Sequence, residues 1–474
     1  PRPDPLPATL ENSVIAASTT TEQPSIAYTE ASSNEIGSIV DVFTQIEIGV
    51  SANFSQHLGL DGEQCKPTTL HGMQSTLAEV ERETGVTPAL VYVYFVPDAG
   101  EADAVVTGSD RPPRANDQLE VMLITQDSEP VRRRRWGVTR EQVNEASQNL
   151  RRYATSEFSA ARQYLEPGQQ LYDWIMQPLE SELHQRNVES IGFVMDTGLR
   201  TIPIATLHDG EQFLVENYSL GLLPTFSLTD FESIATGSAA QDRLRDRTDF
   251  SNTQVLAMGA SEFDNQPDLP AVGEEITLIT EKLWEGDAFL NEDFNLDNLQ
   301  SQLQNKNYGI IHLATHAAFE SGDLDQSFIQ LWDDQLSLSE MASLNLSEAD
   351  IRMIILSACS TALGDEDSEY GFAGFAVNAG SQSAMASLWP VNDEGTLGFM
   401  AQFYEHLAES PVRAEALRQA QMSLIRGDVG INDGDVYGPD GKVIAALPSL
   451  AASGRWDFSH PFYWSAFTMI GNPW

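Results

Sequence analysis

The segments GIIHLATH (Gly309–His316) and MIILSACS (Met353–Ser360) decide the fold. Each is a short apolar run rich in isoleucine, the pattern of a strand that is buried on both faces. Similar runs alternate with amphipathic stretches of helical spacing, and they lie at Ile191–Asp196, Val255–Gly259, Ser383–Trp389 and Phe467–Ile470. This alternation predicts an α/β fold, in which a mostly parallel sheet carries helices on both faces.

Both quoted segments carry a reactive side chain near their end, His316 in one and Cys359 in the other. Crossover connections bring the carboxyl ends of parallel strands to one edge of the sheet, where ligand and catalytic sites gather. If the two strands are neighbours, the imidazole accepts the thiol proton and the thiolate attacks a carbonyl. The backbone N–H groups of Ala317 and Cys359 are placed to hold the resulting oxyanion. From position alone, a small buried cysteine without chemistry is an equally valid interpretation.

The other histidine and cysteine of interest have simpler interpretations. His312 lies four residues before His316, roughly 13 Å back along a strand, so we expect a hydrogen-bonded interior histidine. Cys65 lies in the polar stretch GLDGEQCKPTT, which is typical of an exposed loop.

Two cysteines form neither a disulfide framework nor a zinc cluster, and we expect no metal and no cofactor. The acids of Gly427–Gly454 do not fit a calcium loop.

The charge balance restricts the partners. The chain has 70 acidic and 26 basic residues, a net charge of −44. Such a field repels phosphate backbones, so nucleic acid is a poor candidate partner. The acidic residues predict a solubilising surface, suited to high salt, with attraction of basic substrates as the alternative. No apolar run reaches the length of a membrane span, and the sequence opens on PRPDPLPATL without Met or a signal peptide. We therefore expect a soluble protein, either cytoplasmic or an exported fragment of a longer one.

Composition and periodicity divide the chain into three regions. Residues 1–40 are rich in Pro, Ser, Thr and Glu, which predicts a flexible linker or arm. Residues 41–164 have mixed α/β character and contain the basic cluster Arg132–Arg135, predicted as a solvated strand or hairpin edge, with a protease-sensitive loop as the alternative. Residues 165–474 contain the alternating strands and helices described above.

The motifs from about residue 165 to the end resemble those of the CHAT family, bacterial relatives of caspases and separase. The matching segments occur in order along the chain and include IGFVMDTGLRTIPIATLHDG, VLAMGASEF, GIIHLATHAAF, MIILSACSTALG, SAMASLWPVNDEGT and HPFYWSAFTMIGNPW. The resemblance implies a caspase-like α/β fold, with a pseudo-caspase half at about 165–300 and a catalytic half at about 301–474, preceded by a smaller mixed α/β region. It also implies a cysteine endopeptidase that acts on protein or peptide substrates, with His316 as base and Cys359 as nucleophile.

Two further positions follow from the resemblance. The family's usual Gly after the histidine is Ala317 here, and its methyl group restricts the backbone conformation that the oxyanion site needs. The segment LWPVND resembles the lining of separase's primary specificity pocket, where an Asp receives a basic residue. By that analogy Trp389 and Asp393 bind the substrate. The alternative is that Asp393 caps a helix that starts at Glu394.

Two other functions remain open at this point. A catalytically silent CHAT domain would serve as an interaction or scaffold module. Ala317 and the lack of a preceding helical-repeat segment favour this function, whereas the retention of His316 and Cys359 opposes it. An acyl hydrolase that uses the same dyad on non-peptide esters is the second, because a fold alone does not decide the substrate. The oligomeric state cannot be read from the sequence.

Overall fold

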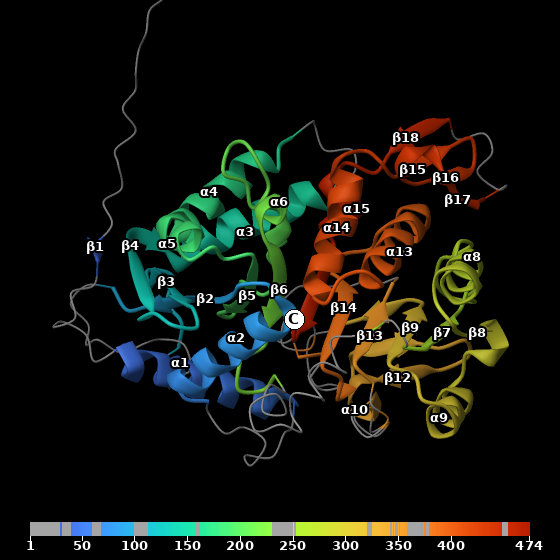
Figure 1. Ribbon diagram of the computed structural model, residues 1–474, viewed down its shortest axis with the longest axis horizontal. Coiled ribbons are helices and arrows are strands. Elements are labelled where there is room, and N and C mark those ends of the chain that lie inside the picture. The colour runs from blue at the N-terminus through green and yellow to red at the C-terminus, as the bar shows by residue number, and fades with distance from the viewer. Residues whose placement is uncertain are drawn as a thin grey trace, which may run out of the picture.

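The computed structural model describes residues 29–30, 39–58, 68–98, 112–156, 162–229, 250, 253–319, 325–341, 351–357, 379–447 and 454–474, with residues 344, 346, 349, 371, 374 and 375. The predicted nucleophile Cys359 and the other cysteine, Cys65, lie outside the described residues. The flexible arm predicted for residues 1–40 lies almost wholly outside them as well. The described part is organised around one large sheet (Figure 1).

The large sheet has twelve strands in the described part of the chain. Their order from one edge to the other is β1 (Thr29–Glu30), β4 (Val131–Thr139), β3 (Gln118–Ile124), β2 (Pro88–Val96), β5 (Ser190–Met195), β6 (Ser219–Leu223), β19 (Phe467–Gly471), β14 (Ser383–Ser387), β13 (Met353–Leu356), β9 (Ile310–Ala314), β7 (Val255–Gly259) and β8 (Gly286–Leu290). In this order, neighbouring strands from β2 to β19 are parallel, and so are neighbouring strands from β14 to β8. The pair β19–β14 is antiparallel, and so are the pairs β1–β4, β4–β3 and β3–β2.

Helices cover both faces of this sheet (Figure 1). One layer, below the sheet in the view, contains α1 (Ile39–Leu58), α2 (Leu70–Thr84), α9 (Leu296–Asn305) and α10 (Leu338–Met341). The other contains α3 (Arg140–Ala154), α4 (Leu165–Ile175), α5 (Glu180–Gln185), α6 (Leu214–Asn217), α8 (Val272–Leu278), α13 (Asp393–Leu407), α14 (Arg413–Ile425) and α15 (Pro461–Trp464). A π-helix, Ile279–Leu283, continues α8. Because both faces are covered, every residue of β2, β5 and β13 is buried, and the predicted α/β fold class is confirmed.

Two small sheets and four short 3₁₀ helices complete the described elements. The first sheet contains β10 (Ala317–Ala318), β11 (Phe328–Gln330) and β12 (Gln335–Ser337), and the second contains β15 (Gly430–Asn432), β16 (Asp435–Tyr437), β17 (Val443–Ala446) and β18 (Arg455–Asp457). The 3₁₀ helices are Gln177–Leu179, Ile204–Thr206, Asn291–Asp293 and Pro439–Gly441. Strands β15, β16 and β17 of the second sheet lie in the stretch Gly427–Gly454, whose acids do not fit a calcium loop, and β18 follows it directly.

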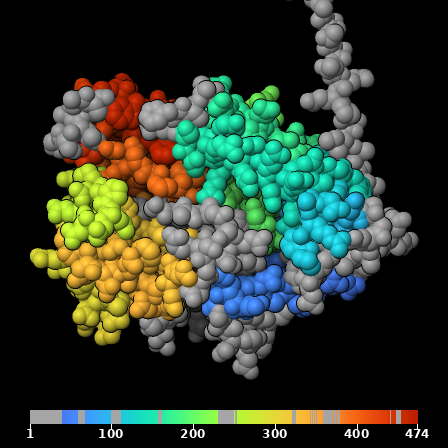
Figure 2. Space-filling model, turned by 180° about the vertical axis from the view of Figure 1, so that it is seen from behind, coloured from blue at the N-terminus to red at the C-terminus, as the bar shows by residue number. Residues whose placement is uncertain are grey.

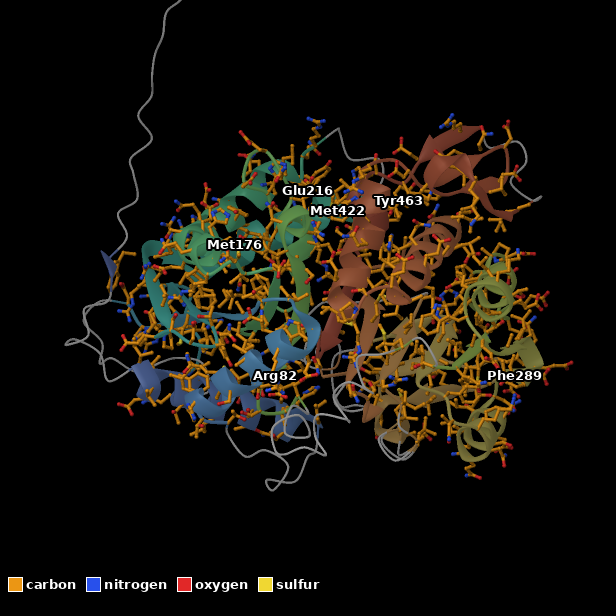
Figure 3. All side chains as sticks on the ribbon, viewed as in Figure 1. Arg82, Met176, Glu216, Phe289, Met422 and Tyr463 are labelled. Carbon is orange, nitrogen blue, oxygen red and sulfur yellow. The ribbon has the colours of Figure 1, made fainter. Side chains whose placement is uncertain are left out.

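The sheet consists of two halves that meet where β6 lies beside β19. Ile470 pairs with Leu222, and Gly221 lies so close to Pro473 that a Cβ there would come within 2.5 Å of a proline carbon, so only glycine fits. The helices join the halves too, since Arg418 of α14 donates to the backbone carbonyls of Val215 and Glu216 in α6. Figure 3 shows Glu216 of α6 near Met422 of α14. Seen from behind, the blue-to-green residues and the yellow-to-red residues occupy opposite sides of the molecule (Figure 2).

The predicted domain limits can be compared with this sheet. Strand β5 pairs along its whole length with β2, so no break in the sheet occurs near residue 164. Strands β7 and β8, which a division at residue 300 assigns to the first half, pair with each other and, through β7, with β9 of the second. In terms of sheet topology the halves therefore separate between residues 223 and 255. The division into domains itself stays a prediction.

The basic cluster Arg132–Arg135 lies in β4, inside the sheet. The expected strand is therefore confirmed, but a solvated edge and a protease-sensitive loop are both wrong. Arg132 and Arg135 are only 6% and 3% exposed. Arg132 and Arg134 both bond to the buried carboxylate of Glu120, which explains why these charges face inward.

Candidate active site

His316 lies two residues beyond the end of β9. Its Nε2 is 2.8 Å from the carbonyl oxygen of Pro267, and its ring packs on Phe263 with 4.7 Å between ring centroids. A carbonyl only accepts hydrogen bonds, so Nε2 carries the proton. In the neutral imidazole Nδ1 is then left as the acceptor, the state that a general base requires.

The strand that leads to Cys359 is the parallel neighbour of β9. Leu356 of β13 pairs with Leu313 of β9, and the N–H of Ser357 donates to the carbonyl of Leu313 at 3.1 Å. The prediction that the two strands are neighbours is thus confirmed. Cys359 follows Ser357 by two residues but lies outside the described residues, so the dyad itself stays a prediction.

Ala317 stands in β10, opposite Ile329 of β11, and is 1% exposed. The N–H of Gln330 donates to the carbonyl of His316 at 2.8 Å, which makes His316 and Gln330 a hydrogen-bonded pair. In an antiparallel ladder the next pair is not hydrogen-bonded, so the N–H of Ala317 points away from β11. Its φ is not positive, and the alanine methyl group therefore causes no backbone strain here. An oxyanion role for this N–H stays a prediction.

Asp393 is the first residue of α13, but it does not cap that helix. Asn392 is the N-cap and accepts from the N–H of Gly395 at 2.9 Å, so the alternative drawn from the sequence is wrong. Asp393 Oδ2 instead accepts from the N–H of Ala271, the residue that precedes α8. Burial is the main cause that raises the pKa of Asp393 to about 7. The negative charges of Glu275 and Glu394 also raise this pKa, whereas the hydrogen bond from Ala271 lowers it.

Trp389, the other predicted substrate contact, is 3% exposed. Its indole N–H donates to the carbonyl of Phe462 at 3.0 Å. The indole is therefore held in place from the side of the C-terminal segment, and its contribution to a substrate pocket stays a prediction.

Sequence reasoning missed the loop at residues 260–271, which connects β7 to α8. This loop supplies Phe263 and Pro267 to His316 and the N–H of Ala271 to Asp393. One signal was available, because the loop follows directly after a buried strand that lies beside β9. By the same edge rule that selected His316, this loop belongs to the candidate site.

His312 is fully buried and bonded at both ring nitrogens. Nε2 lies 2.9 Å from Glu275 Oε1, and Nδ1 lies 3.2 Å from the hydroxyl of Tyr404. The predicted hydrogen-bonded interior histidine is thus confirmed. Neither partner was identified from the sequence.

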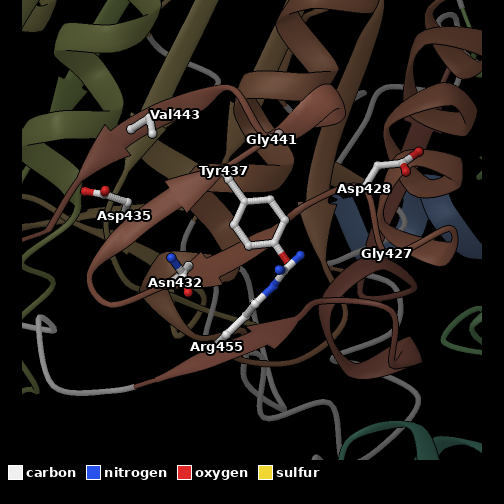
Figure 4. Close-up of a pocket in the computed structure, with 9 residues that line it drawn as sticks. Gly427, Asp428, Asn432, Asp435, Tyr437, Gly441, Val443 and Arg455 are labelled. Carbon is white, nitrogen blue, oxygen red and sulfur yellow. The ribbon is translucent and has the colours of Figure 1, made fainter.

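A separate pocket of about 350 Å³ opens on the four-stranded sheet (Figure 4). Its charged and aromatic lining comes from Asp428, Asp435, Tyr437 and Arg455, with the guanidinium of Arg455 5.3 Å from the Tyr437 ring centroid. Of the predicted site residues that the structure describes, none lines this pocket. Among the described residues, no group of three or more His, Cys, Asp or Glu is arranged to hold a metal ion. In the same residues no helix is long and apolar enough to cross a membrane.

Comparison with known proteins identifies a family. Residues 165–472 match the CHAT domain, which confirms the family predicted from the motifs. Among solved structures the chain is similar to the separase–securin complex of Saccharomyces cerevisiae, with 9% identity, a TM-score of 0.46 and coverage of 85% of this chain and 31% of that chain. It is also similar to the complex of Porphyromonas gingivalis RgpB pro- and mature domains, with 11% identity, a TM-score of 0.36 and coverage of 70% and 77%. This chain thus spans less than a third of the yeast chain's length, and no curated protein matches its sequence.

Proposed function

This chain belongs to the CHAT-domain family, and on that premise we propose that it is a cysteine endopeptidase whose catalytic dyad is His316 and Cys359. One observation carries the proposal. The strands that precede the two residues in the chain, β9 and β13, are parallel neighbours, and His316 has Nε2 engaged by Pro267, which leaves Nδ1 to accept a proton.

In the proposed mechanism, Nδ1 of His316 takes the thiol proton of Cys359, and the thiolate attacks the scissile carbonyl carbon. The oxyanion is held by the backbone N–H groups of Ala317 and Cys359. The imidazolium then gives its proton to the leaving amine. In the second stage the imidazole takes a proton from water, the water oxygen attacks the acyl carbon, and the thiolate leaves and regains its proton. Pro267 stabilises the imidazolium, because its carbonyl accepts from Nε2 throughout.

We further propose that Asp393 favours cleavage after a basic residue, with Trp389 in the same segment. The supporting observation is the acidic surroundings of Asp393, where Glu275 and Glu394 add negative charge. Only the ionised carboxylate pairs strongly with a guanidinium or ammonium group. Because the pKa of Asp393 is raised to about 7, the preference for Arg or Lys over neutral residues should strengthen as the pH rises from 6 to 8. Loss of this pH dependence in Asp393→Ala, measured as a ratio of kcat/KM values, is the expected result.

The dyad is tested by peptide-library digestion and by labelling with an iodoacetamide probe. Cys359→Ala should abolish cleavage and leave the fold intact, and His316→Ala should slow the alkylation of Cys359 by about 10²-fold or more, since the base that generates the thiolate is gone. Cys65→Ala is the matched control and should keep full activity.

Full proteolysis by Cys359→Ala would sink the proposal. Turnover of a simple ester without any peptide cleavage would point to an acyl hydrolase instead. A Cys359 that alkylates no faster than Cys65 would point to a silent interaction module.

A further inference from the structure

A buried cluster of polar side chains lies beneath the candidate site. Glu275 of α8, His312 of β9 and Tyr404 of α13 are each 1% exposed or less, and His312 bonds to both of the others. Glu275 keeps its second oxygen, Oε2, buried without a hydrogen-bond partner among the described residues. Such a cluster costs more free energy than well-packed apolar side chains of the same volume. Its presence indicates a role other than stability.

The bond between Glu275 and His312 closes a ring of contacts that includes His316. In one direction, the chain leads from His312 in β9 to His316, four residues later and two residues beyond the end of the strand. In the other, Glu275 lies one turn into its helix, where its N–H donates to the carbonyl of Ala271 at 2.9 Å, and the preceding loop leads back to Pro267. The ring closes where Nε2 of His316 meets the Pro267 carbonyl at 2.8 Å.

The loop in this ring is held by hydrogen bonds of its own. The N–H of Leu269 donates to the carbonyl of Ser261 at 2.9 Å, and the N–H of Val272 donates to the carbonyl of Leu269 at 3.2 Å. Asp393 accepts from the N–H of Ala271 at the end of the loop. A loop braced in this way moves with α8, so the position of Glu275 relative to β9 sets the position of the Pro267 carbonyl.

We propose that Glu275 and His312 are positioning residues that hold the Pro267 carbonyl against His316 and so fix which ring nitrogen of His316 carries the proton. When their bond is lost, α8 and the loop shift relative to β9, and Nε2 loses its fixed acceptor. The consequence for catalysis rests on the proposed dyad, whereas the ring of contacts does not.

The test measures the tautomer of His316 by ¹⁵N chemical shifts of its ring at pH 8, in full-length Cys359→Ala protein, so that no thiolate perturbs the imidazole. The double variant Glu275→Leu/His312→Leu replaces both partners by apolar groups and is made in the Tyr404→Phe background, because the Tyr404 hydroxyl would otherwise lose its partner His312 and stay buried without a hydrogen bond. We expect its ratio of Nε2–H to Nδ1–H tautomer to fall about fivefold to tenfold, the loss of one hydrogen bond. Glu275→Gln, whose amide oxygen still accepts from His312, should keep at least half of the wild-type ratio.

Tyr404→Phe is the matched control, because it removes the other hydrogen bond of His312, which lies outside the ring. Its tautomer ratio should equal that of wild type. An unchanged ratio in the double variant overturns the proposal, and so does an equal fall in Tyr404→Phe, since general loosening around His312 would then be the cause.

The same changes in protein that retains Cys359 should lower kcat and leave KM unchanged. Failure of the proposed dyad is recognised separately, by full activity of Cys359→Ala, and the tautomer measurement still decides the positioning role in that case.

Discussion

Two buried glutamates, Glu120 of β3 and Glu275 of α8, one from each half of the molecule, have very different partners. Glu120 of β3 accepts from Arg132 Nε at 2.9 Å, from Arg134 Nε at 2.7 Å and from the Tyr94 hydroxyl. Burial alone raises the pKa of Glu120, but the two guanidinium groups outweigh burial and hold it below its usual range. Glu275 in the second half bonds through one oxygen to His312, and its other oxygen has no partner within the described part of the chain.

This difference separates charges that support the fold from charges that support a site. In the first half the acid and the bases compensate one another inside the sheet. In the second half the negative charge of Glu275 acts on Asp393, a half-buried carboxyl whose pKa is raised to about 7. Groups with perturbed pKa values and incomplete compensation concentrate at functional sites. Of the two buried glutamates, the less compensated one lies in the half that carries His316.

The largest effect should come from breaking the compensated cluster. Arg132→Leu leaves Glu120 buried with one cation fewer, which should cost about 3–5 kcal/mol of unfolding free energy. Urea unfolding at pH 7 measures the loss. Arg133→Leu, on the same strand, removes a half-buried pair with Glu182 at 3.4 Å and should cost clearly less. Equal losses in the two variants would mean that pairing with the buried Glu120 carboxylate is not what makes Arg132 important.

A smaller effect, with a pH dependence, should come from Asp393→Asn. Because the folded-state pKa of Asp393 is raised from 3.8 to about 7, the folded state binds more protons than the unfolded state between these values, and stability falls as the pH rises through them. The amide removes this loss. Relative to wild type, the variant should therefore gain on the order of 2 kcal/mol between pH 5 and pH 8.

Unfolding by urea at the two pH values gives that difference directly. Asp287→Asn is the control, because hydrogen bonds from Lys306 and Tyr308 lower the pKa of Asp287, so its ionisation is complete in both states above pH 5. If the difference in unfolding free energy between Asp393→Asn and wild type were the same at pH 5 and pH 8, the buried charges of the second half would be as well compensated as those of the first.

The sequence predicted the sheet where strands are continuous apolar runs. The runs that became β5, β7, β9 and β13 were each recognised to within a few residues. β6 and β8 were missed, because SLGLL and GDAFL are short and contain glycine or a charge, which weakens a strand pattern. The direction of β19 was also beyond reach, since its antiparallel pairing with β14 depends on where the chain returns and not on its own residues.

The candidate site was predictable only in part, for a similar reason. His316 was found because it follows an apolar strand, which is a local pattern. Its acceptor Pro267 lies 49 residues away in sequence, and the Ala271 N–H that Asp393 binds lies 122 residues away. A polar loop carries no periodicity that marks such contacts, so the fold alone brings them together.

The smallest effect should come from the exposed ion pair of the second half, between Lys306 and Asp287. Nζ lies 2.7 Å from Oδ2, yet the two side chains are 47% and 33% exposed, so water screens their attraction. Lys306→Met should cost no more than about 1 kcal/mol at low salt, and even less at high salt. Urea unfolding at two salt concentrations measures this. A loss as large as that of Arg132→Leu would show that the second half also depends on paired charges. The incompletely paired Glu275 would then be an exception among the charges of that half.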